Sequence, residues 1–283
     1  MRIANLNNRL VLLSGDTALD VAEASAGRFG PDILSAYDNW DDFAAWGKTA
    51  DFSAAKPVNL ADLGAPIPFP RQIFAIGLNY RDHADEASLP YPENPMVFTK
   101  FASSLAGPHS TIKADTSAID FEAEMVVVIG KKADRVKAAD GWKHVAGITI
   151  GQDLTERDVQ WRPPAPQFSM GKSLRGYGPF GPAVVSLDEI ADPENLAVQG
   201  VLTGPGADGE MVIQNGNTKD LIFSVPQLIE RLSEHVTLFP GDIIFTGTPA
   251  GVGMGREPKL FMKPGNVLTT RLGDIAEIVT TFV

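Results

Sequence analysis

Short apolar runs, separated by turns that contain proline and glycine, dominate the pattern of this chain of 283 residues. Residues 121–129 and 145–152 are almost continuously apolar, apart from two glutamates, and such runs are typical of strands buried on both faces. Further strands are predicted at residues 72–77, 96–100, 183–186, 196–202, 211–214, 243–246, 267–272 and 275–283. Pro-Gly pairs at 240–241 and 264–265 mark turns between strands. The pattern predicts an α+β, β-rich fold, either a sandwich or a barrel, rather than alternating βα units.

Fewer segments have the pattern of a helix. The best candidates are residues 155–160 and 226–233, and the polar segment 79–86 is compatible with a third helix. Residues 88–95 contain three prolines, so we expect either a lid or an ordinary surface loop there.

The first 66 residues have a different pattern from the rest. They predict a hairpin around residues 5–16, followed by short helices near 20–26 and 32–48. Three prolines within residues 63–70 indicate an extended linker. We therefore predict a small N-terminal accessory domain at 1–66 and a catalytic domain at 67–283, which the chain length allows.

Composition excludes several classes of function. The formal net charge is -11 and no cluster of Lys or Arg occurs, so we expect neither a nucleic-acid nor a membrane partner. The chain has no cysteine, which removes disulfides, thiolate nucleophiles and Cys-ligated zinc. No apolar run approaches the roughly 20 residues of a membrane-spanning helix, and none resembles a signal peptide. These features predict a cytoplasmic enzyme that acts on a small molecule.

Glu122 and Glu124 are the most informative residues. Side chains alternate between the two faces of a strand, so these two carboxylates project together from an apolar run. Asp153 ends the apolar run that begins at residue 145. Buried carboxylates repel one another and need a cation, a shared proton or water. The three predict a site for Mg²⁺ or Mn²⁺, which prefer oxygen ligands, whereas on an edge strand the same pattern would be a solvated face.

His83 and Glu86 are three residues apart, so in a helical turn they lie on one face and can form a hydrogen bond. A carboxylate orients an imidazole and raises its basicity, which suits a general base that acts on water. The alternative is an ion pair on the surface of a helix.

Two short motifs typical of other enzyme classes lack the flanking residues that those classes require. Residues 171–173 read Gly-Lys-Ser, but a phosphate-binding loop also needs glycine at position 166, which is proline. Residues 176–181 satisfy a bare GxGxxG pattern, but prolines at 179 and 182 exclude the helix that a dinucleotide site requires. The four histidines do not form HExxH, and no GxSxG motif occurs.

Five segments in order, residues 77–86, 121–124, 151–160, 171–173 and 245–253, closely resemble the fumarylacetoacetate hydrolase family. More narrowly they resemble its short members: acylpyruvate hydrolases, oxaloacetate decarboxylases and isomerase-decarboxylases of aromatic degradation. The resemblance spans roughly residues 70–283. It implies a catalytic domain built as a mixed β-sandwich roll, a small N-terminal domain and a homodimer.

The resemblance also implies roles for single residues. Glu122, Glu124 and Asp153 match the ligands of Mg²⁺ or Mn²⁺. The catalytic residues implied are His83, Glu86 and Lys172, and the substrate-binding residues implied are Asn79, Arg157, Gln160 and Thr248. One departure is Leu78, because some relatives carry a basic residue at this position that supplies a second clamp for a carboxylate.

The implied reaction is cleavage of a C–C bond in a 2,4-dioxo acid, such as an acylpyruvate or fumarylpyruvate, to pyruvate and a carboxylic acid. His83, held by Glu86, would deprotonate a water that attacks the distal carbonyl group, while Lys172 and Gln160 stabilise the developing charge. Arg157 would bind substrate oxygens or pair with acidic neighbours. Decarboxylation of a β-keto acid, isomerisation of a dienoate and a silent metal- and dicarboxylate-binding relative remain the alternatives.

Other residues have two interpretations each. Trp161, Phe168 and Phe180 would line a pocket or belong to the core. Gly247 and Gly251 would permit close approach of the backbone to substrate or make turns.

Overall fold

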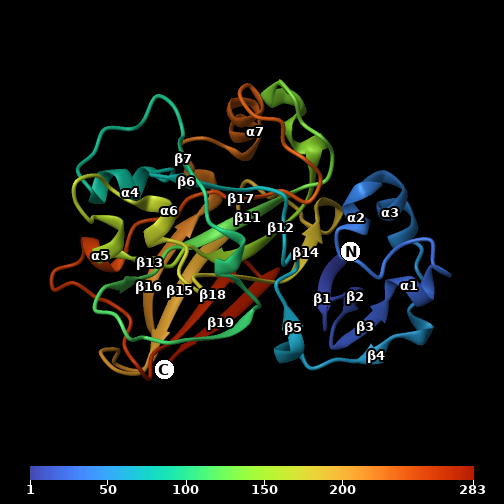
Figure 1. Ribbon diagram of the computed structural model, residues 1–283, viewed down its shortest axis with the longest axis horizontal. Helices are drawn as coiled ribbons and strands as arrows, with labels where there is room; N and C mark the ends of the chain where they lie inside the picture. The colour runs from blue at the N-terminus through green and yellow to red at the C-terminus, as the bar shows by residue number, and fades with distance from the viewer.

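Strands outweigh helices in the computed structural model, which describes residues 1–283 with 34% strand and 23% helix. Most strands belong to two open sheets that pack face to face (Figure 1). The large sheet has the order β4 (Lys56–Pro57), β3 (Thr17–Asp20), β2 (Arg9–Ser14), β1 (Arg2–Leu6), β14 (Gly178–Ser186), β12 (Val145–Gln152), β11 (Ala123–Ile129), β17 (Ile243–Phe245), β6 (Ile73–Gly77) and β7 (Met96–Phe98). β5 (Leu63–Gly64) pairs with β1, and β8 (Leu105–Ala106) pairs with β14.

The second sheet has the order β16 (Met211–Asn217), β15 (Ala197–Thr203), β18 (Val267–Leu272), β19 (Ala276–Phe282) and β9 (His109–Ile112). β10 (Ile119–Asp120) and β13 (Thr155–Glu156) form a separate pair. Neither sheet closes on itself, so the β-rich α+β prediction is confirmed as a sandwich and not as a barrel.

β11 is buried along its whole length because it has a hydrophobic core on each face. Met125 and Val127 point into the core between the two sheets. Val126 and Val128 point into a second core on the opposite face. Alternate side chains of a strand therefore all meet apolar neighbours, which explains the continuous apolar run in the sequence.

Seven α-helices surround the sheets: α1 (Val21–Ala24), α2 (Ser35–Asp38), α3 (Trp40–Gly47), α4 (Arg81–Glu86), α5 (Arg157–Gln160), α6 (Phe168–Gly171) and α7 (Val225–Ser233). Short 3₁₀ helices lie at Phe52–Ala54, Leu60–Asp62, Ala102–Ser104, Ala138–His144, Leu187–Glu189, Thr218–Asp220 and Gly253–Gly255. α7 packs Leu228, Ile229 and Leu232 against the core between the sheets. None of the helices is both long and apolar enough to cross a membrane.

Several predicted elements differ from the structure. The helix predicted over residues 155–160 begins only at Arg157, because residues 155 and 156 form β13. The helical segment expected over residues 32–48 is divided at Asn39, whose backbone is not helical (φ −138°, ψ 66°) and whose side chain donates to Asp42. The strand expected at 183–186 begins at Gly178 and includes part of the glycine-rich segment. That segment is therefore a strand and not a nucleotide-binding turn.

Residues 1–66 are joined to the rest of the protein through both backbone and side chains. β1 pairs with β14, so that Ile3 lies opposite Val184 and the large sheet runs without a break from the N-terminal strands to the central ones. The second core likewise includes Ile3 and Phe43 together with Phe245. Because sheet and core cross the predicted boundary near residue 66, we expect the two segments to unfold together.

Tryptophan fluorescence can test this expectation. The double variant Trp142→Phe/Trp161→Phe leaves Trp40 and Trp46, which report on residues 1–66, and the reverse pair reports on the remainder. In each variant, the urea midpoint from fluorescence should coincide with the midpoint from circular dichroism, as in a two-state transition. If the two midpoints separate in both variants, residues 1–66 are an independent domain.

Candidate active site

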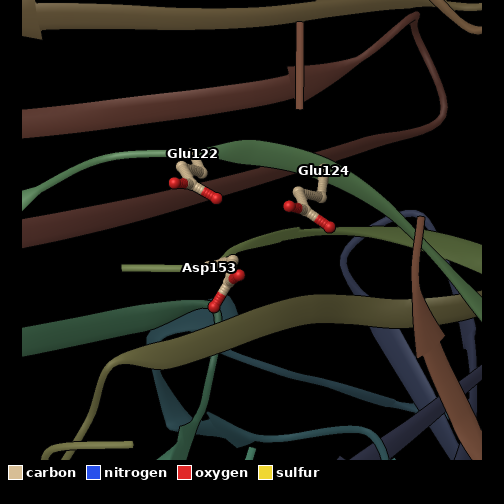
Figure 2. Close-up of side chains that lie close together, drawn as sticks. All are labelled: Glu122, Glu124 and Asp153. Atoms are coloured by element: carbon tan, nitrogen blue, oxygen red, sulfur yellow. The ribbon is translucent and has the colours of Figure 1, made fainter. Parts of the chain in front are cut away.

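Two neighbouring strands bring three carboxylates to one point. Glu122 directly precedes β11, Glu124 is its second residue, and Asp153 directly follows β12. Antiparallel pairing aligns Glu124 with Gly151, and the amide of Asp153 donates to the carbonyl oxygen of Glu122 at 2.9 Å. One oxygen from each carboxyl group lies within 4.8 Å of the other two (Figure 2). All three side chains are buried, so the alternative of a solvated face does not apply.

Two buried lysines hold this acidic triad. The Nζ of Lys172 donates to Glu122 and Asp153, both at 2.7 Å, and to Thr155 at 2.8 Å. These bonds use all three donors of the ammonium group. The Nζ of Lys100 donates to the other oxygen of Asp153 at 2.7 Å and to the carbonyl oxygen of Lys172. Lys172 therefore positions two of the three carboxylates, and Lys100 supports both Asp153 and Lys172.

Arg157 anchors the remaining side of Glu122. Its Nη2 donates to Glu122 at 2.8 Å, its Nε donates to Asp120 at 2.8 Å, and its Nη1 donates to the side-chain oxygen of Gln160 at 2.8 Å. Of the two roles expected for Arg157, the structure shows the pairing with acidic neighbours. Arg157 and Gln160 lie three residues apart on α5, so both side chains reach the same site.

The cations divide the triad into two kinds of carboxylate. Burial by itself would raise the pKa of Glu122, but the charges of Lys172 and Arg157 outweigh burial and lower this pKa to about 2. For Glu124, burial and the repulsion from Asp153 and Glu122 together raise the pKa well above its usual value. Glu124 accepts a hydrogen bond only from the backbone amide of Gly247, at 2.8 Å, and has no cationic partner.

This arrangement fits a hard divalent cation. Three buried carboxyl groups supply oxygen ligands at one point. Glu124 lacks a cationic hydrogen-bond partner, whereas each of the other two carboxylates has one. Mg²⁺ and Mn²⁺ take such ligands, and a bound cation would relieve the repulsion within the triad. Glu122, Glu124 and Asp153 are thus a candidate site for a divalent metal ion.

The loop after β17 connects the triad with the predicted catalytic pair. Gly247 and Gly251 have φ angles of +100° and +105°, in the region that favours glycine. The amide of Gly247 donates to Glu124, and the amide of Gly251 donates to Glu86 at 3.0 Å. A Cβ atom at position 251 would lie 2.3 Å from the carbonyl oxygen of Ile213. These glycines therefore make turns that aim their amides at two functional glutamates.

His83 and Glu86 lie on α4, which follows β6, and the Nδ1 of His83 is 3.3 Å from Glu86 Oε2. Their side chains are 17% and 23% exposed, so the pair lies at the rim of the site and is partly shielded from solvent. Burial would raise the pKa of Glu86, but hydrogen bonds from His83 and from the Gly251 amide lower it. Glu86 thus remains a carboxylate that orients the imidazole and ties α4 to the glycine loop.

A cavity of about 270 Å³ is lined by His83 and by two residues of the triad, Glu122 and Glu124, and its volume is near the lower end of ligand pockets at about 300–1,000 Å³. Its polar end is lined by His83, Glu122, Glu124, Arg157, Gln160, Lys172 and Thr248. The aromatic rings of Phe98, Trp161 and Phe168 form part of its wall, with Trp161 and Phe168 centroids 5.6 Å apart. Trp161 and Phe168 therefore line the pocket, which was one of the two interpretations of these aromatic residues. Phe180 belongs to the second core, which was the other.

The polar side-chain groups of two predicted substrate-binding residues form hydrogen bonds with other groups of the protein. Asn79 is fully buried outside the cavity lining, and its amide group bonds to the backbone of Phe223 and Thr246. It joins loops and does not reach the pocket. The hydroxyl group of Thr248 lines the cavity, but it donates to the carbonyl oxygen of Ala123 and accepts from Gln214. By contrast, the side-chain nitrogen of Gln160 has no partner within the protein.

Three residues that support the site were not predicted from the sequence: Lys100, Asp120 and Gln214. Asp120 accepts from Arg157 and from the backbone amides of Gly253 and Met254, so it fastens the glycine loop to the site. Gln214 bonds to the backbone of Ala123 and to Thr248. The available signal was a charged side chain at the end of an apolar strand, which Lys100 and Asp120 share with the triad.

Comparisons with known proteins agree with this geometry. The family model described as "Fumarylacetoacetate (FAA) hydrolase C-terminal" matches residues 72–283. The human protein named "Oxaloacetate tautomerase FAHD2A, mitochondrial" is 39% identical over 221 residues, which cover 77% of this chain and 68% of that protein.

Solved structures are similar over the whole chain. An HpcE-like protein from Mycobacterium smegmatis is 46% identical with a TM-score of 0.91, and the match covers 100% of this chain and 99% of that one. Maleylpyruvate hydrolase from Sphingobium sp. SYK-6, solved with manganese (II) ion and pyruvate, is 26% identical with a TM-score of 0.81 and the same coverage.

Replacement of Glu124 tests the metal site. Glu124→Gln keeps an acceptor for the Gly247 amide but removes the charged ligand, so Mn²⁺ affinity measured by calorimetry should fall at least about 100-fold. The metal-free variant should be no less stable than the wild type, because a buried carboxylate repelled by its neighbours is lost. Glu210→Gln, at an exposed glutamate, is the matched control. Unchanged Mn²⁺ binding in Glu124→Gln would refute the assignment.

Proposed function

Because this chain belongs to the fumarylacetoacetate hydrolase family, we propose that it is a divalent-cation-dependent enzyme that cleaves a C–C bond of a 2,4-dioxo acid by hydrolysis. The family membership expected from the five motifs is confirmed, and the family contains hydrolases, isomerases and tautomerases. The observation that carries the proposal is that His83 lines one cavity with Glu122 and Glu124 of the acidic triad, while Glu86 holds His83. A base beside a metal site is what water-dependent cleavage requires.

The residues of the triad would hold Mg²⁺ or Mn²⁺. Such a cation would act as a Lewis acid that polarises the 2-oxo group of the substrate and stabilises negative charge on its oxygen. Lys172 and Arg157 keep Glu122 ionised and in place for this role. The manganese in the similar maleylpyruvate hydrolase supports a divalent cation but does not select between the two metals for this chain.

The remaining steps belong to the protein's own side chains. His83 removes a proton from water, and the resulting hydroxide attacks the 4-oxo carbon of the substrate. The bond between C3 and C4 then breaks, and its electron pair moves to C3 to give pyruvate enolate and a carboxylic acid. The protonated His83 returns its proton to C3, which completes pyruvate. The side-chain nitrogen of Gln160 is positioned at the cavity to donate to a substrate oxygen.

Tautomerisation of oxaloacetate is the second candidate, and the name of the 39% identical human relative favours it. The same base and cation could move a proton between C3 and the 2-oxo oxygen without any attack by water. Loss of CO₂ from oxaloacetate is a further variant of the same enolate chemistry. These reactions differ from hydrolysis in their products, so one set of assays separates them.

The assays use purified protein with Mg²⁺, and with EDTA as a control, on acetylpyruvate and on oxaloacetate. Hydrolysis predicts EDTA-sensitive pyruvate formation from acetylpyruvate, with one ¹⁸O atom from labelled water in the acetate. Equilibration of enol and keto oxaloacetate, without cleavage of any dioxo acid, would replace the proposal by the tautomerase. Pyruvate and CO₂ from oxaloacetate alone would replace it by the decarboxylase.

His83→Ala should lower the rate of hydrolysis by about 10²–10⁴-fold, the usual contribution of a general base. Mn²⁺ affinity should stay the same, because His83 is not part of the triad. Glu86→Gln should cause a smaller loss, since glutamine can still accept from the Gly251 amide. Asp85→Asn on the exposed side of α4 is the matched control. If His83→Ala hydrolyses at the wild-type rate, another base operates.

We also propose that the chain forms a homodimer through the edge at β7. This strand ends the large sheet, and Val97 on it is 46% exposed. Phe101 and Met170 beside it are also about half exposed, and the Phe101 amide bonds to Ser173 near Met170. Unpaired edges with exposed apolar side chains are suited to docking a second chain.

Light scattering should therefore give twice the mass of one chain. Val97→Lys should produce a monomer at the same concentration, because it places a charge on the proposed contact. Val212→Lys, on β16 in the other sheet, is the matched control and should leave the dimer intact. A wild-type monomer would contradict the proposal.

The cytoplasmic location stays a prediction, since the name of the human relative places that protein in mitochondria.

A further inference from the structure

The cavity lining has a charged part and a larger apolar part. The charged part comprises Glu122, Glu124, Arg157 and Lys172. The apolar part includes Leu78, Leu89, Met96, Trp161, Phe168 and Val252. No lysine or arginine lies among these residues. A substrate whose 2-oxo acid group binds at the charged end would place its distal acyl group against this apolar wall.

Each cation at the charged end is already paired with protein oxygens. Lys172 uses its three donors on Glu122, Asp153 and Thr155. Each of the three nitrogens of Arg157 donates to a protein oxygen, on Asp120, Glu122 or Gln160, and two of these partners are carboxylates that balance its charge. Neither side chain can turn to a second substrate carboxylate without leaving a buried carboxylate of the protein unpaired, which is costly.

Arg256 is the other cation near the catalytic pair, and it is also occupied. Its Nε donates to the carbonyl oxygen of Gly251 at 2.9 Å, and its Nη2 donates to that of Ile213. It does not line the cavity. His83 must be neutral to act as a base, so it does not supply a lasting positive charge either.

The net charge of the buried cluster also favours a substrate with a single carboxylate. The buried cluster has three basic and four acidic side chains: Lys100, Arg157 and Lys172 with Asp120, Glu122, Glu124 and Asp153. With a divalent cation bound, this cluster carries at most one net positive charge. One substrate carboxylate neutralises it, and a second would be buried against apolar side chains without a partner.

We infer that the substrate has a single carboxylate and that its distal acyl group is uncharged and apolar. The inference rests on the proposed function, because it assumes that the 2-oxo acid group binds at the triad. It separates this chain's preferred substrate from dicarboxylates such as fumarylpyruvate and oxaloacetate, and it makes the apolar wall the determinant of specificity.

Equilibrium binding tests the inference without depending on turnover. The probes are 2-oxoglutarate and 5-methyl-2-oxohexanoate, which differ only in whether a carboxylate or an isopropyl group ends the chain. Neither has a 4-oxo group, so neither can be cleaved. In calorimetry with Mg²⁺-loaded protein, the isopropyl compound should bind at least about tenfold more tightly, because an unpaired buried carboxylate is disfavoured. Equal affinity, tighter binding of 2-oxoglutarate, or no binding of either compound would overturn the inference.

A pair of variants at Leu78 tests the cause. Leu78 lines the cavity next to the catalytic helix. Leu78→Lys supplies the missing cation, and Leu78→Gln is a polar control of similar size without charge. Leu78→Lys should bind 2-oxoglutarate about tenfold more tightly than Leu78→Gln does, as expected for a hydrogen bond between charged groups. If the two variants bind it equally, the lack of a cation at this wall does not explain the preference.

Kinetics then distinguish this inference from the proposed function. The matched substrates are 4-methylpentanoylpyruvate and succinylpyruvate, which again exchange an isopropyl group for a carboxylate. If both are hydrolysed with equal kcat/KM, hydrolysis is correct and the inference is wrong. If neither is hydrolysed but the isopropyl 2-oxo acid still binds more tightly, the inference about the pocket holds and the proposed hydrolysis fails.

Discussion

Burial of three carboxylates at one point is the constraint on which the rest of this site depends. The pairing of β11 with β12 brings Glu122, Glu124 and Asp153 together in the interior, where like charges repel strongly. Lys172, Lys100 and Arg157 make this arrangement possible, because their charged hydrogen bonds neutralise Glu122 and Asp153. Glu124 is left without a cation, and this imbalance is what suits the site to a divalent metal ion. The same need for compensation explains why buried lysines stand at the centre of a hydrophobic fold.

The glycine loop after β17 links the position of the buried carboxylates to that of His83 and Glu86. The amide of Gly247 donates to Glu124, and the amide of Gly251 donates to Glu86, so one short loop connects the acidic triad with the His83–Glu86 pair. Asp120 fastens the far end of that loop and also holds Arg157. Residues that touch no substrate therefore fix the relative position of those that do, which is the usual condition for a precise active site.

Related proteins with this fold include a hydrolase and tautomerases, and the structure suggests how one architecture serves several reactions. A polar end that polarises a 2-oxo acid is common to all of these chemistries. The reaction then depends on whether a base and a water lie beside the substrate, and the specificity depends on the wall opposite. In this chain the proposed base is His83, and much of the cavity wall is apolar and aromatic. Fold and family therefore leave the choice of reaction to a few side chains around the cavity.

The sequence by itself determined the long central strands, the three carboxylates of the candidate metal site and the candidate catalytic pair, because their signals are local. A continuous apolar run reports a strand buried on both faces, alternation along it puts Glu122 and Glu124 on one side, and a spacing of three joins His83 to Glu86. Only the tertiary structure decided which residues support them. Lys100 and Asp120 reach the site from distant segments, Asn79 turns to backbone groups and not to the pocket, and residues 1–66 continue the large sheet. The physical reason is that hydrogen-bond partners and shared cores are set by the packing of segments far apart in the chain, which no local pattern of residues records.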